Sequence, residues 1–240
     1  MNEDPKFQVR PLYLQVRDAL LARIKDGKWR PGGNLPSEID LYQEMGVSLG
    51  TLRKALGVLE AEQLIVREPG RGTFVRGHQR GQTLDRFNPM RGADGLPVGG
   101  QVKTRKVRLG SPTGGERAVL RLDASDKVVR IHRIRLHERR PFAYELVCLP
   151  ERRFPGLAAR AEIPDNLEGL AQAWGILVAR AEGQVRAVPA SPAAAAALSV
   201  ADGAAVLSLE RIAFDTDDQP VEAMTAYFDL RNAYCRLEMR

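Results

Sequence analysis

The sequence predicts an α+β protein with two domains joined by a linker. A small, mainly helical domain is expected at residues 1–76, a linker and loop at 77–100, and a larger domain built on an antiparallel sheet at 101–240. Three observations support this division. Apolar residues recur at helical spacing in the first part, and glycine is abundant in the middle. A unit of one helix and one β-hairpin occurs twice in the last part.

Two helices are predicted first. One begins after Pro11, and its apolar residues recur every fourth position on one face: Leu12, Val16, Leu20 and Ile24. It ends at KDGKWRPGG, where glycine and proline break a helix. The second begins after Ser37, a good N-cap, and reaches about Met45, where Gly46 suits a left-handed C-cap.

A third helix follows after a tight turn, capped by Ser48 and expected at about 49–62. Its buried stripe is Leu52, Ala55, Leu56 and Leu59, and its outer face is Gly50, Arg53, Lys54 and Gly57. Two glycines on a surface face lower helix propensity, so this face suggests close approach of another molecule, with the cations meeting phosphates. A short helix, a turn and a basic helix form a helix-turn-helix arrangement. The alternative is a helical bundle with a solvated charged face.

A short β-hairpin is predicted directly after the third helix. LIVR and TFV read as its strands, and residues 68–72 join them with a proline and a glycine suited to a turn. Arg71 lies at the tip between two glycines, and Arg67 and Arg76 flank it. Such a ribbon is a wing that reaches phosphate or a minor groove beside a recognition helix.

Residues 11–75, from PLYLQVRDAL through LPSEIDL and GVSLGTLRKALGVLE to EPGRGTFV, resemble the winged helix-turn-helix of GntR-type bacterial regulators. The resemblance implies binding to double-stranded DNA. Together with the basic face, it implies DNA contacts at Ser37, Ser48, Gly50, Thr51, Arg53, Lys54, Arg71, Gly72 and Thr73. Leu49 and Ile39 depart from the family pattern, because many members carry arginine there. We therefore expect an altered operator sequence.

The second domain is predicted from a weak internal repeat. Residues 119–136 and 197–214 align without gaps, and each contains the end of a helix, an Asp-containing turn and a β-rich run. Each is followed by a turn with proline and a second β-rich run. Ser191 and Pro192 suit the start of the alanine-rich helix in the second copy, and LEGLAQAWGI supplies a further helix between the copies.

Strand alternation places charge on apolar faces in this domain. Arg133 and Arg135 share a face with aliphatic residues, Glu145 does so on the return strand, and Arg211 occupies the matching place in the second copy. A turn near residue 139 would set Glu145 opposite Arg133. Two interpretations remain open, because buried charge must be paired. The pair fixes the sheet register, or it forms the floor of a pocket for an anionic small molecule.

The segments VVRIHRIRL, RPFAYELVCLP and VLSLERIAFDTDDQPVEAMTAYFDLRNAY resemble the UTRA effector-binding domain of the HutC-like branch of this family, a fold shared with chorismate lyase. The resemblance implies an antiparallel sheet with helices, dimerisation and a metabolite pocket. We expect the effector to contact Arg133, Arg135, Glu145, Tyr227, Phe87 and Arg211. Phe87 lacks the hydroxyl neighbours typical of sugar-phosphate-binding relatives, so we do not expect a phosphosugar effector.

Composition excludes several classes of protein. The net charge of +6 and pI of about 9.6 permit a polyanionic partner. No run reaches the ~18–20 apolar residues of a membrane helix, and no signal region begins the chain, so we expect a cytoplasmic protein. Cys148 and Cys235 are expected as free thiols. No zinc spacing, phosphate-binding glycine loop or nucleophile elbow occurs, so no cofactor, metal or enzymatic activity is expected.

These observations predict a bacterial transcription regulator. We expect a repressor that binds a pseudo-palindromic DNA operator as a homodimer and is released by a small, anionic metabolite. Two alternatives remain open. One is a DNA-binding protein without an effector, and the other is a lyase-like enzyme fused to a DNA-binding domain.

Overall fold

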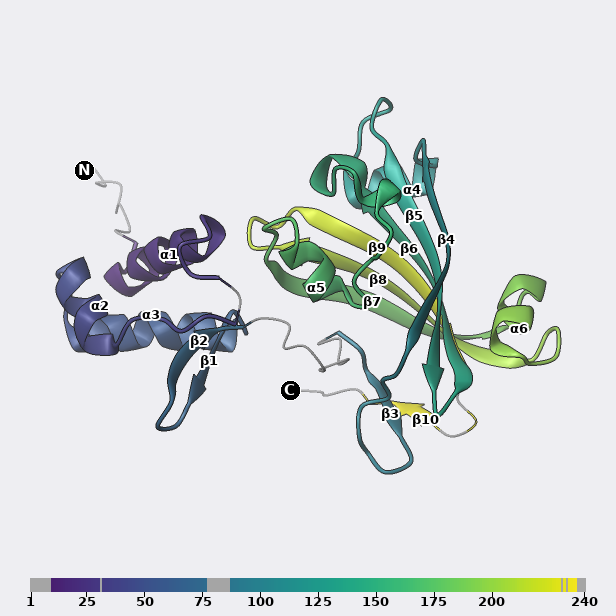
Figure 1. Ribbon diagram of the computed structural model, residues 1–240, viewed down its shortest axis with the longest axis horizontal. Helices are drawn as coiled ribbons and strands as arrows, with labels where there is room; N and C mark the ends of the chain where they lie inside the picture. Colours follow the sequence, from purple (N-terminus) through teal and green to yellow (C-terminus); the bar gives the residue numbers. More distant parts are fainter. Residues whose placement is uncertain (1–9, 31, 77–86, 230, 232, 237–240) are drawn as a thin grey trace, which may run out of the picture. The chain divides into compact units, whose positions relative to one another are not determined.

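The computed structural model describes residues 10–30, 32–76, 87–229, 231 and 233–236. The chain divides into two compact units, Met1–Gln79 and Arg80–Arg240. Figure 1 shows the helices and the hairpin of the first unit and the large sheet of the second. Each unit is described by itself below.

The first unit contains three helices and one hairpin: α1 (Leu12–Lys25), α2 (Glu38–Met45), α3 (Leu49–Ala61), β1 (Ile65–Glu68) and β2 (Gly72–Val75). The predicted caps are present, because the hydroxyls of Ser37 and Ser48 accept hydrogen bonds from the backbone N–H groups of Asp40 and Thr51. Gly46 ends α2 in the left-handed region with φ of 63°. These caps confirm the short connection between α2 and α3.

The core of the first unit lies between α1 and α3. Val16, Leu20 and Ile24 of the predicted α1 stripe are buried, whereas Leu12 is 54% exposed, so that part of the prediction is wrong. The whole predicted stripe of α3 is buried, with Leu52 and Leu56 fully enclosed. The hairpin is tied to the helices by the segment before α2, because Leu35 donates its N–H to the carbonyl of Thr73 and Asn34 bridges to Phe74. A two-stranded ribbon is marginal alone, so this third segment holds the hairpin in place.

The second unit is built on a six-stranded antiparallel sheet (Figure 1). Its strands, in spatial order, are β4 (Val102–Gly110), β5 (Val128–His137), β6 (Arg140–Pro150), β9 (Pro220–Phe228), β8 (Ala205–Asp215) and β7 (Val178–Pro189). The helices are α4 (Gly114–Leu120), α5 (Leu167–Gln172) and α6 (Pro192–Leu198), and short 3-10 turns occupy Glu151–Arg153 and Leu157–Ala159. α4 precedes the β5–β6 hairpin and α6 precedes the β8–β9 hairpin, so the predicted helix–hairpin repeat is confirmed.

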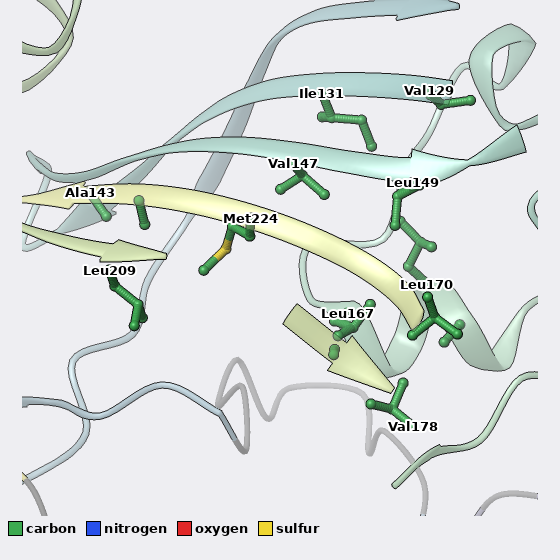
Figure 2. Packing of buried hydrophobic residues seen from close by; sticks show 14 of the residues in the cluster. Val129, Ile131, Ala143, Val147, Leu149, Leu167, Leu170, Val178, Leu209 and Met224 are labelled. Atoms are coloured by element: carbon green, nitrogen blue, oxygen red, sulfur yellow. The ribbon is translucent and has the colours of Figure 1, made fainter. Parts of the chain in front are cut away.

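The two faces of this sheet carry different helices. The larger core lies on the face covered by α5, which we call the inner face, and Figure 2 shows Val129, Ile131 and Met224 packed there with Leu167 and Leu170 of α5. The other face, called the outer face, packs against the remaining helices. Leu120 of α4 contacts Cys148 and its neighbours, and the alanines of α6 pack beside Val206.

The stretch expected to be linker and loop contains structure that we did not predict. β3 (Met90–Gly92) pairs with β10 (Ala233–Cys235) in a separate two-stranded sheet, and Met90 is fully buried. The sequence pattern missed β3 because three residues among glycines carry no periodicity. Residues 77–86 of that stretch lie outside the described residues.

Candidate DNA-binding surface and effector site

The two glycines on the outer face of α3 are not required by packing within their own unit. Arg53, Lys54 and Gly50 are exposed, and Gly57 is half-buried. A Cβ added at Gly57 would meet nothing within 4 Å, and one added at Gly50 would meet only the hydroxyl of Ser48 at 3.9 Å. The fold therefore does not require glycine at either position, although alanine would form a better helix. Close approach of DNA to this face, which would account for both glycines, stays a prediction.

Side chains at the start of α3 are held in a fixed arrangement. The hydroxyls of Ser48 and Thr51 are 2.9 Å apart, and the N–H of Thr51 donates to Ser48. Ser37 donates its hydroxyl to the carboxylate of Asp40 at 2.7 Å. Ile39 is 59% exposed on α2. Ser37 and Asp40 lie at the first turn of α2, and Ser48 and Thr51 lie at the first turn of α3.

The wing presents a cation at its tip. Arg71 is exposed, pairs with Glu68 and lies over the ring of Phe74 with its guanidinium carbon 5.8 Å from the ring centroid. Gly72 has φ of 119°, and a Cβ there would come within 3.0 Å of Asn34. Glycine at this position is therefore required by the hairpin itself. Thr73 is half-buried, and its backbone carbonyl holds the segment before α2.

The charged residues of the inner face are buried and paired. Arg133 and Glu145 are register partners on β5 and β6, and Nε of Arg133 donates to Oε2 of Glu145 at 2.5 Å. Nε of Arg135 donates to Oε1 of the same carboxylate at 3.0 Å. All three residues are at most 4% exposed. The predicted juxtaposition of Arg133 and Glu145 is therefore present, and Arg135 completes a triad.

Two arginines keep the carboxylate of this triad ionised. Burial raises the pKa of Glu145, but the charges of Arg133 and Arg135 outweigh it and hold the pKa at about 2. A buried carboxylate with both oxygens bonded is stable only while its partners remain in place. Any anion that binds the arginines must therefore compete with Glu145.

A second buried pair lies on the same face. Nη2 of Arg211 donates to Oε1 of Glu222 at 2.7 Å, and both residues are at most 4% exposed. Glu222 was missed by the sequence analysis. The signal was available, since the acid alternates with Met224, Ala226 and Phe228 along one strand face.

Four of the predicted effector residues converge on one place. Phe87, Arg135, Glu145 and Arg211 line a cavity of about 10 Å³, which holds at most one water molecule. Phe87 contributes to the lining, and its carbonyl accepts a hydrogen bond from Nη1 of Arg211 at 3.3 Å. These residues are therefore assembled around a space too small for a metabolite.

The structure does not bring Tyr227 into this group, which corrects our expectation. Ala226 is the register partner of Glu145, so the next residue, Tyr227, projects from the outer face. Its ring stacks on Tyr144 with centroids 6.4 Å apart and packs beside α6. The pairing of β6 with β9 decides this orientation.

The outer face holds a larger hollow that the sequence analysis missed. Its cavity is about 850 Å³, and its lining includes His132, Thr225 and Glu210 from the sheet and Glu116 from α4. Hydrogen bonds from Arg130 lower the pKa of Glu116 to about 2. Burial lowers the pKa of His132 and raises the pKa of the Cys148 thiol, so both groups stay neutral near pH 7.

Comparison with known proteins agrees with both units. The family model described as bacterial regulatory proteins, gntR family, matches residues 12–75, and the model of the UTRA domain matches residues 99–231. The chain belongs to the GntR family and carries a UTRA domain. A histidine utilization repressor from Pseudomonas putida is 32% identical over 138 residues, which cover 57% of this chain and 53% of that protein.

Two other comparisons cover most of the chain. The HTH-type transcriptional repressor NagR of Bacillus subtilis is 29% identical over 210 residues, which cover 85% of this chain and 84% of NagR. The crystal structure of PhnF from Mycobacterium smegmatis shares the fold with a TM-score of 0.57 and 22% identity, covering 94% of this chain and 99% of PhnF.

This GntR-family chain is a DNA-binding transcription regulator with a domain for a small-molecule effector, and the family and its named relatives are regulators rather than enzymes. Within the described residues, no helix is long and apolar enough to cross a membrane. No group of His, Cys, Asp or Glu side chains in that part of the chain is placed to hold a metal ion.

Proposed function

We propose that this chain is a cytoplasmic repressor that binds a pseudo-palindromic operator as a homodimer and leaves it when a small metabolite binds the inner face of the UTRA domain. The observation that carries the proposal is the small cavity where Phe87, Arg135, Glu145 and Arg211 meet. Buried arginines around one carboxylate form a preorganised set of donors for an anionic group.

The charges of the site favour one class of effector. Arg133 and Arg135 offer donors to a carboxylate or another planar anion, whereas Glu145 offers acceptors to an amine or hydroxyls. An amino acid or a related molecule carries both kinds of group. The name of the relatives called histidine utilization repressors makes histidine a natural first probe.

Binding requires the site to open, because about 10 Å³ holds no metabolite. The residue that must move is Phe87, whose carbonyl and ring contact Arg211. In sequence it stands between the sheet and the segment that leads back to the DNA-binding unit. Displacing it would couple the pocket to the spacing of two DNA-reading units, and such coupling is usually worth ~1–3 kcal/mol, or a 5- to 150-fold change in affinity.

The small volume of the cavity favours one alternative. In this alternative the Arg133–Glu145–Arg135 triad only fixes the sheet register, and the protein binds DNA without an effector. The two interpretations predict different effects of added metabolites. A triad that is only structural binds no free metabolite, so no metabolite should stabilise the protein or release its DNA.

A thermal-shift screen tests the proposal. Histidine, other amino acids, dicarboxylates and inorganic phosphate are added to the full chain, and hits are assayed for release of DNA selected from a random duplex pool. A ligand at ~100 times its dissociation constant adds about 2.7 kcal/mol to stability. We expect a hit that releases DNA from the wild-type chain but not from Arg133→Ala. A variant that melts early yet still releases DNA would place the effector elsewhere.

A further inference from the structure

Glu38 lies where α2, α3 and the wing meet. It is the first residue of α2, and Oε2 of its carboxylate accepts a hydrogen bond from Nε of Arg53 at 2.7 Å. Its Oε1 lies 3.8 Å from Nη2 of Arg67 in β1. Arg53 belongs to the outer face of the recognition helix, and Arg67 belongs to the wing. One carboxylate therefore contacts cations of both elements that we expect to meet DNA.

The contact with Arg53 orients the side chain more than it stabilises the fold. The Arg53 side chain is 60% exposed, and ion pairs in such positions add little to stability. Glu38 occupies Nε of the guanidinium, which leaves the two terminal nitrogens for a partner outside the protein. These nitrogens form the donor pair that binds O6 and N7 of a guanine.

Arg67 is held by charge without complete hydrogen bonding. Its Nε lies 3.6 Å from Oε2 of Glu60, and within the described residues neither Nε nor Nη2 makes a hydrogen bond, although both atoms are shielded from solvent. Shielded donors without acceptors are costly, so this guanidinium gains when an acceptor reaches it. Glu38 and Glu60 keep it beside the helices until then.

The carboxylate also reduces attraction to DNA of any sequence. The cations of α2 and α3 are Arg53 and Lys54, and α2 itself contains no Lys or Arg. A negative charge at Glu38 cancels part of this small positive field and repels phosphate. Lower affinity for unmatched DNA raises the ratio by which a matched site is preferred.

We propose that Glu38 is a positioning residue for DNA recognition in this chain. It aims Arg53 at a guanine, restrains Arg67 of the wing, and lowers binding to unmatched DNA. This inference rests on the DNA binding proposed above and adds to it the residue that sets discrimination.

The test compares Glu38→Gln with the wild-type chain on three kinds of duplex. They are the site that the wild-type chain selects from a random pool, versions of that site in which one guanine–cytosine pair is replaced, and an unmatched duplex of unrelated sequence. We expect the preference for the selected site to fall by about 3- to 10-fold at one such pair. Binding to unmatched duplex should tighten, and the salt dependence should steepen by about one phosphate contact.

Two variants serve as controls. Glu44→Gln removes a carboxylate from the other end of α2, where it pairs with Arg23 at 2.9 Å, and should leave discrimination unchanged. Glu38→Asp keeps the charge and should restore the wild-type affinity for unmatched DNA.

Three outcomes would overturn the inference. Glu38→Gln with wild-type discrimination would show that Arg53 needs no positioning. Equal weakening on the selected site and on the unmatched duplex, together with a lower melting temperature, would show that Glu38 is only structural. If the wild-type chain selects no DNA sequence, the proposed operator binding is wrong, and the inference about Glu38 fails with it.

Discussion

Glu145 of β6 bonds Arg133 of β5 through Oε2 and Arg135 of the same strand through Oε1, on a sheet face whose other buried residues are mostly apolar. The triad is nearly inaccessible to water, so each member depends on the other two. The free-energy cost of burying these three charges is the reason for proposing an effector site on this face. A hydrophobic trio would have filled the same space without desolvating three charges.

Glu145→Gln should destabilise the UTRA domain strongly, because it leaves two buried arginines without a counter-charge. We expect a loss of about 3–5 kcal/mol in the free energy of unfolding, measured by urea denaturation. The triple variant Arg133→Met, Arg135→Met and Glu145→Leu should recover much of this loss, since an apolar trio avoids desolvation of charge. Additive losses in the triple variant would contradict the coupling.

The low pKa of Glu145 predicts a pH dependence of stability. The pKa lies at about 2 in the folded chain against 4.5 ordinarily, so the unfolded chain takes up the proton more readily. The carboxylate therefore adds stability above pH 4.5, and this contribution of about 3 kcal/mol is lost as the pH falls toward 2. Urea unfolding at pH 3 to 7 should show it, and Glu145→Gln should show a flatter profile.

Arg53→Ala should weaken binding to the selected DNA site by about 1–3 kcal/mol, because a bidentate contact to guanine is lost. The side chain is exposed and its ion pair with Glu38 is weak, so the melting temperature should stay near that of the wild type. A folded Arg53→Ala protein that binds the site as tightly as the wild type would refute the assignment.

Gly57→Ala should separate stability from DNA binding. No atom lies within 4 Å of the added Cβ, so the helix should gain about 0.5–1 kcal/mol of stability. DNA binding should weaken nonetheless, because the methyl group occupies space that DNA approaches. Gly115→Ala in α4, also unobstructed, is the matched control that should leave DNA affinity unchanged. Unaltered affinity in Gly57→Ala would show that this face meets only solvent.

The chain should be a dimer at micromolar concentration. One winged unit covers little DNA, and two related by a dyad would read half-sites roughly 34–36 Å apart, subject to the space that the wings need. Sedimentation velocity and a footprint on the selected site check this together. A monomer with an asymmetric footprint would contradict the proposal.

The local signals of the sequence determined most of the DNA-binding unit. Ser37, Ser48 and Gly46 are cap residues whose effect depends on atoms within a few positions, so helix bounds follow from the chain itself. The opposition of Arg133 and Glu145 was also predicted, from a turn near residue 139. Its exact register depends on an irregularity between Arg135 and Leu136, which no sequence signal indicated.

Only the tertiary structure decided the rest of the effector site. The pairing of β6 with β9 turned Tyr227 to the outer face, and the carbonyl of Phe87 reached Arg211 from far along the chain. Glu222 became the partner of Arg211 through the β8–β9 register. Such contacts join positions that are distant in sequence, and their register depends on the packing of the whole sheet. They therefore cannot be predicted from the alternation of residues along one strand.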